Sequence, residues 1–192
     1  ANALPTSTDV ASKRFSDGLV EFSNGGYIAG GIPGPGAPIT KLSYGLETST
    51  RLPGASLSYH LYLGASVSNS LEGYFGGGTP GPGITYTTLD KCTYSSDTTA
   101  QAPAGANFTH GKYGLGATGN TTDGYWGGGF NPAATYTTMD KLTYASDTTA
   151  QVPGASMKYT LGYNNATGNL TGGYWFGGQN PVYSSTQKVT YS

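Results

Sequence analysis

Polar and apolar side chains alternate over short stretches of this chain, which is the pattern of half-buried β-strands. In the segment 136–144, Leu142 and Tyr144 fall on one face of an extended chain, whereas Lys141 and Thr143 fall on the other. Threonine and tyrosine, which favour strands, dominate this segment. No stretch of useful length carries the 3.6-residue period of an amphipathic helix, so the pattern predicts an all-β protein.

The stretch that follows indicates how many strands to expect. Asp147-Thr148-Thr149 is typical of a tight turn, because an aspartate can bond to the backbone two residues on. We expect a strand over 149–152 after this turn, then strands over 157–163 and 172–177 with a turn at 164–168 between them. The pattern predicts about four short strands in a unit of about 49 residues.

This unit recurs along the chain. An aromatic segment leading into a glycine doublet begins at Gly26, Gly73, Gly124 and Gly173, at spacings of 47, 51 and 49 residues. The doublets are Gly30 and Gly31, Gly77 and Gly78, Gly128 and Gly129, and Gly177 and Gly178. A Lys-x-x-Tyr element also recurs, at Lys41, Lys91, Lys141 and Lys188. This period predicts a single repeat domain over 1–192, with units of roughly 1–44, 45–94, 95–144 and 145–192.

The order of elements within a unit resembles the kelch repeat. An apolar strand ends in Gly-Gly, a variable loop follows, and then come a strand ending in Tyr, a turn and a strand led by Pro. The tryptophan and arginine that recur in many kelch families are absent from their usual places. The resemblance implies a four-unit kelch-like β-propeller of four-stranded antiparallel blades. The segment Gly73-Tyr-Phe-Gly-Gly-Gly78 and the Asp-Thr-Thr-Ala runs also resemble glycine-rich repeats of phage structural proteins.

The two ends of the chain complement each other. The last unit stops before its Asp-Thr-Thr-Ala-Gln-x-Pro part, and the first residues, Ala1, Asn2, Ala3 and Leu4, resemble the missing strand. We therefore expect the N-terminal strand, residues 1–5, to complete the last unit. It does so within one molecule, which closes a ring, or in a neighbouring molecule, which makes a filament. The sequence leaves both open.

Composition narrows the classes of function. Only 10% of the 192 residues are charged and the net charge is −1, which gives no electrostatic footprint for nucleic acid or an anionic membrane. No apolar run reaches the ~20 residues of a membrane span. The single cysteine, Cys92, excludes an intramolecular disulfide and shares a column with Leu42 and Leu142, so it is expected in the core. A surface rich in Thr, Ser, Tyr and Gly points to an extracellular or virion-surface location.

Candidate chemistry is sparse. His60 and His110 occupy like positions but supply too few ligands for a metal site. Asp90 and Asp140 each precede a lysine on the opposite strand face and form no carboxylate pair. The glycine doublets lack the Gly-Lys-Ser/Thr of a phosphate loop, so we interpret them as structural. We expect no cofactor and no enzymatic activity.

Two surface roles remain candidates. The aromatic residues beside the glycines are expected to pack between units, but alternation turns some outward, where they can stack on sugars. The sugar-stacking candidates are Trp126, Trp175, Tyr125 and Tyr174. The Asn-x-Thr sequences at Asn107, Asn120, Asn165 and Asn169 are candidate glycosylation sites in or near expected loops.

The sequence thus favours a non-enzymatic structural protein, a subunit of a virion appendage or an extracellular fibril. Its partners would be copies of itself or other virion or surface proteins. The alternative is a carbohydrate-binding propeller module that uses exposed tyrosine and tryptophan. Neither hypothesis involves nucleic acid or insertion into a membrane.

Overall fold

The structure, a computed structural model, describes residues 25–30, 37–178 and 186–191. In this part of the chain it is all-β: fourteen strands form four antiparallel sheets, and the only helices are two 3-10 turns, η1 (Ala104–Ala106) and η2 (Pro153–Ala155). In each sheet the strands pair in sequence order, as a meander. The predicted all-β class and the predicted division into four antiparallel sheets are confirmed.

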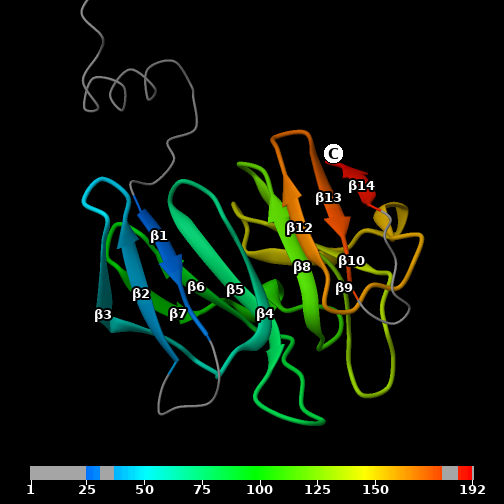
Figure 1. The fold of residues 1–192 in the computed structure, drawn as a ribbon, viewed down its shortest axis with the longest axis horizontal. Coiled ribbons are helices and arrows are strands. Elements are labelled where there is room, and N and C mark those ends of the chain that lie inside the picture. Colours follow the sequence, from blue (N-terminus) through cyan, green and yellow to red (C-terminus); the bar gives the residue numbers. More distant parts are fainter. Residues whose placement is uncertain (1–24, 31–36, 179–185, 192) are drawn as a thin grey trace, which may run out of the picture.

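Each sheet holds one copy of the repeat, but the sheets are shifted along the chain relative to the predicted units. The last strand of each of the first three sheets falls at the start of the next predicted unit, 45–94, 95–144 or 145–192. We call each sheet with the linker that enters it a unit, and Figure 1 shows the sheets coloured from blue for the first to red for the last. Sheet 1 contains β1 (Gly25–Ile28), β2 (Ala37–Ser43) and β3 (Thr48–Leu57). Sheet 2 contains β4 (Tyr62–Ser68), β5 (Glu72–Thr79), β6 (Leu89–Thr93) and β7 (Thr98–Gln101). Sheet 3 contains β8 (Tyr113–Gly119), β9 (Asp123–Phe130), β10 (Met139–Thr143) and β11 (Thr148–Gln151). Sheet 4 contains β12 (Asn165–Gly168), β13 (Gly172–Phe176) and β14 (Gln187–Thr190).

The hydrophobic core is divided into three clusters, each between two consecutive sheets. Sheets 1 and 2 bury Ile39 against Phe75 and Cys92. Sheets 2 and 3 bury a cluster around Trp126, and sheets 3 and 4 bury one around Trp175. A β-sheet is stable only when an apolar face is covered, so each unit depends on its neighbours for a core.

Two predicted elements of the fourth unit are wrong. The segment 157–163 is not a strand, and the predicted turn at 164–168 is the strand β12. Met157 and Leu161 are buried, but they lie in an irregular segment that follows η2. Their spacing in the sequence is the same as that of alternate residues on one face of a strand. Tyr163 has a φ of 54°, a left-handed conformation that interrupts an extended chain just before β12. The strands near 149–152 and 172–177 are confirmed as β11 and β13. The turn predicted at 147–149 lies earlier, over residues 144–147, and Thr148 and Thr149 belong to β11.

The glycine doublets mark where each second strand ends and the next unit approaches. Gly128 and Gly129 have φ of 72° and 83°, and the Gly129 N–H donates to Leu161 O of the linker into sheet 4 at 2.7 Å. A Cβ on Gly128 would lie 2.5 Å from the same Leu161 O. The other described doublets, Gly77–Gly78 and Gly177–Gly178, have the same left-handed φ, as does Gly30. Gly31 and the predicted closing strand, Ala1 to Leu4, lie outside the described residues.

The doublets generate the first prediction. Gly128→Ala should lower the free energy of unfolding by about 1–3 kcal/mol from the left-handed backbone alone, with the contact to Leu161 O adding to this. Urea unfolding followed by circular dichroism measures the loss. Gly154→Ala is the matched control, because no atom lies within 4 Å of a Cβ built there. An unchanged midpoint for Gly128→Ala would contradict the assigned role.

Candidate functional site: the junctions between units

The same aromatic contact holds each sheet to the next. The tyrosine beside the glycine on the second strand of one unit stacks on the tyrosine of the Lys-x-x-Tyr element of the following unit. The ring centroids are 4.5 Å apart for Tyr27–Tyr94, 5.4 Å for Tyr74–Tyr144 and 4.5 Å for Tyr125–Tyr191, and the interplanar angles are 10°, 16° and 11°. Aromatic pairs stabilise by about 0.5–1.5 kcal/mol beyond their burial, and this pair occurs at every described junction.

A lysine and an acidic residue complete the contact at the first two junctions. Lys91 pairs with Tyr74 across β5 and β6, which places its Nζ 5.5 Å from the centre of the Tyr74 ring. Asp147 of the next unit accepts hydrogen bonds from Lys91 Nζ at 2.9 Å and from the Tyr74 hydroxyl at 2.6 Å. Tyr27, Lys41 and Asp97 repeat this arrangement between sheets 1 and 2, at 2.6 and 2.8 Å. One carboxylate therefore binds both polar groups of the preceding unit.

A left-handed turn residue presents this carboxylate. Asp97 and Asp147 have φ of 51° and 49° in the turns before β7 and β11. Aspartate tolerates this conformation better than most residues. Glu47 holds the same position in the turn before β3, with φ of 52°. The repeated Asp-Thr-Thr is therefore more than a turn signal, since it directs an acid at the preceding sheet.

The glycine that precedes each junction tyrosine makes room for another ring. A Cβ on Gly73 would lie 2.6 Å from the Tyr94 hydroxyl oxygen of the same unit. Gly26 meets Tyr44 and Gly173 meets Tyr191 at the same distance. In each Gly-Tyr pair, the glycine thus contacts the Lys-x-x-Tyr tyrosine of its own unit, and the tyrosine stacks on that of the next unit.

The junction also fixes the protonation of its members. Burial raises the pKa of Tyr74, and the hydrogen bonds to Asp147 and Glu72 raise it further, so its hydroxyl remains a donor. Burial alone would raise the pKa of Asp97, but the hydrogen bonds from Lys41 and Tyr27 outweigh it and hold that pKa below its usual value. Hydrogen bonds to Asp97 and Tyr27 raise the pKa of Lys41.

A second polar contact fastens the linker that enters each sheet. On β6, Asp90 accepts hydrogen bonds from the backbone N–H and hydroxyl of Ser58, at 2.9 and 2.6 Å. On β10, Asp140 accepts a bond from the Thr109 hydroxyl at 2.9 Å. On β14, Gln187 accepts bonds from two backbone N–H groups of the linker before β12. Asp90 and Asp140 therefore act separately, each on its own linker.

Sequence reasoning missed one buried ion pair in this contact. Lys112 Nζ lies 2.7 Å from Asp140 Oδ2, and both side chains are almost fully buried. The corresponding residues of the flanking units are the apolar Leu61 and Leu161. Burial lowers the pKa of Lys112, with the Asp140 carboxylate acting against it. In the sequence, Gly111 follows His110 where Leu61 follows His60, so a one-residue shift hid the equivalence of Lys112 with the two leucines.

The predicted sugar-stacking tryptophans are buried. Trp126 and Trp175 are fully enclosed, and their indole N–H groups donate to Ala65 O and Gly116 O of the preceding sheet, at 3.3 and 3.0 Å. Tyr125, also buried, lies in the third junction. Alternation separates the two faces of a strand, but in sheet 3 both faces are covered by neighbouring sheets. Of the four candidates, only Tyr174 is partly exposed.

The candidate glycosylation residues lie in different settings. Asn120 and Asn169 begin the turns before β9 and β13, and each Oδ1 accepts bonds from the backbone and hydroxyl of the threonine two residues on. Asn165 is exposed on β12, and Asn107, which follows η1, is partly buried. Glycosylation of these residues stays a prediction.

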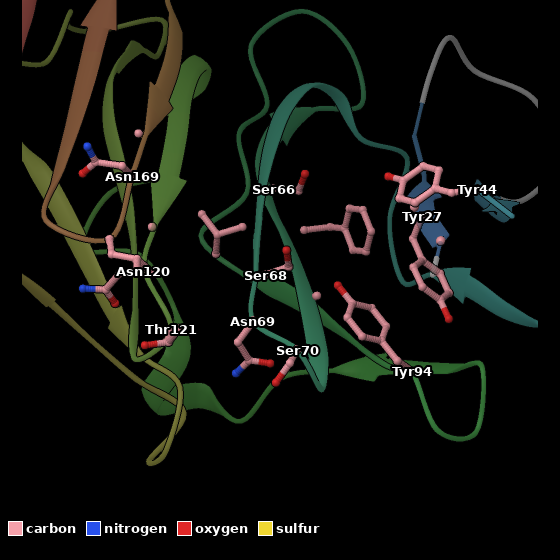
Figure 2. Close-up of a pocket in the computed structure, with 18 residues that line it drawn as sticks. Tyr27, Tyr44, Ser66, Ser68, Asn69, Ser70, Tyr94, Asn120, Thr121 and Asn169 are labelled. Carbon is pink, nitrogen blue, oxygen red and sulfur yellow. The ribbon is translucent and has the colours of Figure 1, made fainter. Parts of the chain in front are cut away.

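The turns before β5, β9 and β13 meet residues of sheet 1 around a cavity of about 600 Å³ (Figure 2). Tyr27, Tyr44 and Tyr94 lie on one side of it, and Asn120 and Asn169 on the other. Every side chain that lines it is uncharged. Its walls come from four separate units, so no single stretch of sequence indicates it.

Other candidates play no part in a site. Cys92 is fully buried in the cluster between sheets 1 and 2, and burial raises the pKa of its thiol. His110 is exposed, with its ring 5.2 Å from that of Tyr136, and His60 is partly exposed. Within residues 25–30, 37–178 and 186–191, no three His, Cys, Asp or Glu side chains gather as metal ligands would. No helix in that part of the chain is long and apolar enough to cross a bilayer.

Comparison with models of known protein families finds no match, and comparison with curated protein sequences finds none either. The candidate site therefore rests on the geometry of the junctions.

The first junction predicts an acid-dependent stability. Because the folded-state pKa of Asp97 is lowered, its contribution is present above the unfolded value of about 3.9 and is lost as the pH falls through the folded value. Asp97→Asn should cost about 1 kcal/mol at pH 7, a small figure because the carboxylate is 35% exposed. The difference from wild type should shrink below about pH 4. Urea unfolding followed by tryptophan fluorescence measures it, and Ser95→Ala in the same turn is the control. A difference that stays constant to pH 2.5 or so would reject the role of Asp97.

Proposed function

We propose that this chain is a non-enzymatic structural protein, a subunit of a virion appendage or an extracellular fibril. The observation that carries the proposal is the junction: one tyrosine stack recurs at every described boundary between units, and a lysine–carboxylate bond accompanies it at the first two. In such a chain the recurrent polar and aromatic side chains join the units to one another, as in repeat proteins that build structures from nearest-neighbour contacts.

The proposed architecture is a four-unit kelch-like β-propeller. It is supported by the first strands of sheets 2, 3 and 4, because β4 packs beside β8 and β8 beside β12. Equivalent segments of the three, 63–66, 114–117 and 163–166, line one cavity of about 360 Å³, as blades around a shared axis would. In sheets 2 and 3 the third strand pairs with a fourth, whereas the described part of sheet 4 ends at β14. The edge of β14 is where we propose that Ala1 to Leu4 pair.

The acidic residues support a structural role over catalysis. Every acidic side chain in the described residues except Glu47 bonds to a junction residue, a linker or its own turn. The proposed partners are copies of this chain or other virion or surface proteins, and the proposed location is extracellular or on the virion surface. The low charge of the chain, with 10% of residues charged, supports this location and these partners.

Electron microscopy of the purified chain tests this function. We expect ordered fibres, or regular attachment to particles, at rising protein concentration. Lys91→Glu, which places a like charge beside Asp147 and Glu72, should reduce assembly strongly because it opens the second junction. Lys158→Glu is the control, since Lys158 is exposed and forms neither of the lysine–carboxylate pairs of the junctions. A folded monomer that forms no ordered assembly and attaches to no particle would reject the proposal.

The uncharged cavity favours carbohydrate binding as a second candidate function. Neutral amide and hydroxyl groups beside tyrosine rings suit the hydroxyls and apolar faces of a sugar. With Trp126, Trp175 and Tyr125 buried, this candidate depends on Tyr44, which is 59% exposed at the cavity.

Titration calorimetry with neutral oligosaccharides tests the second candidate. We expect Tyr44→Ala to weaken binding about tenfold, the loss of roughly one stacking contact. Tyr62→Ala removes another half-exposed ring outside this cavity and should leave binding unchanged. Equal affinities for wild type and Tyr44→Ala would exclude the cavity as a sugar site.

A further inference from the structure

Sheet 4 carries one half of a junction with nothing opposite it. Tyr174 on β13 pairs with Lys188 on β14, the same register that joins Tyr74 to Lys91 and Tyr125 to Lys141. Lys188 Nζ lies 5.8 Å from the centre of the Tyr174 ring, as in the other units. Within the described part of the chain, no second tyrosine stacks on Tyr174 and no carboxylate binds Lys188. The tyrosine–lysine half of a fourth junction is therefore formed and has no partner in the described residues.

Sheet 1 carries the opposite half, also open. Tyr44 ends its Lys-x-x-Tyr element and lies over Gly26, as Tyr94 lies over Gly73 in the next unit. Its ring is 59% exposed, whereas Tyr144 at a formed junction is 5% exposed. Glu47 has the left-handed conformation of Asp97 and Asp147, and it is the one acidic side chain of the described residues without a partner. Sheet 1 therefore carries both parts of the opposite half, an exposed tyrosine ring and an unpaired carboxylate.

We propose that Tyr44 and Glu47 form the fourth junction with Tyr174 and Lys188 of the same chain. The Tyr44 ring stacks on Tyr174, and the Glu47 carboxylate binds Lys188 and the Tyr174 hydroxyl. Sheets 1 and 4 then become neighbours, and each unit has a sheet on both sides. This inference deepens the proposed structural function and rests on it, since it names the contact that completes the repeat.

The cavity of Figure 2 favours a partner in the same chain over a second molecule. Tyr44 lies on one side of it, and Asn169, in the turn that leads into β13, lies on the other. One half-junction, at Tyr44, lines this cavity, and the turn that leads into the strand of the other half-junction lines the opposite wall. Groups tethered in one chain meet at an effective concentration in the millimolar range, which a second copy reaches only at high protein concentration.

Charge reversal tests the contact directly. Lys188→Glu and Glu47→Lys should each place like charges together and speed amide hydrogen exchange in β14 and in the turn 44–47 by about fivefold, the scale of a partly exposed ion pair. The double variant restores opposite charges and should return exchange to the wild-type rate. All three proteins should remain monomeric by light scattering at low concentration, so the measurement does not depend on fibre formation. Lys158→Glu combined with Glu47→Lys is the matched control and should give no rescue.

The remaining outcomes overturn the inference. Single variants that exchange like wild type mean that Lys188 and Glu47 do not meet. A 1:1 mixture of the two single variants that forms a stable dimer and regains protection means that the junction joins two molecules. Fibre formation is scored separately by electron microscopy. A protein with the closing contact but no assembly rejects the proposed function alone, and one that assembles without the contact rejects this inference alone.

Discussion

Stacking between tyrosines of consecutive units is the constraint on which the rest of this fold depends. A three- or four-stranded meander cannot enclose a core of its own, and here the apolar clusters lie between sheets. The tyrosine pair sets how closely two sheets approach, and the glycines beneath it admit the second ring. The Lys–Asp bond then fixes the register, because the carboxylate reaches Lys91 and Tyr74 only from the turn of the adjoining unit. Such arrays have a stability that is approximately the sum of units and nearest-neighbour contacts.

Several of the few charged side chains of the chain lie at the junctions between sheets. Four lysines recur at the same position of the unit, and three acidic residues recur in the turn that faces it. Four charged side chains, in the pairs Lys41–Asp97 and Lys91–Asp147, are held between sheets. Partial burial and hydrogen bonding make such a pair contribute more to stability than one at an open surface. The remaining surface is left to Thr, Ser and Asn, whose side chains cap the turns, as Asn69 and Asn120 do.

The architecture was more predictable than its details. The period of the Gly-Tyr and Lys-x-x-Tyr elements gives the number of sheets, and alternation in 136–144 correctly places Leu142 in the core opposite Lys141. Alternation fails at 157–163, since spaced apolar anchors of an irregular linker produce the same pattern as a strand. It also fails for Trp126, since a strand pattern does not reveal whether one or both faces of a sheet are covered. The cavity and the junctions unite residues from different units, which no local window contains.

The span of these contacts bears on how the chain is made. Side-chain bonds across the described junctions join residues 56 to 76 positions apart, between one and about one and a half units of the repeat. A sheet leaving the ribosome therefore waits for a single further unit before its open face is covered, about 3–10 s at ordinary rates of synthesis. At these junctions the apolar face of a sheet is exposed to other nascent chains only for that interval, whereas the proposed contact between sheets 1 and 4 forms only after the last unit is made. An added unit would therefore leave the wait at the other nearest-neighbour junctions unchanged and lengthen only the wait for the closing contact.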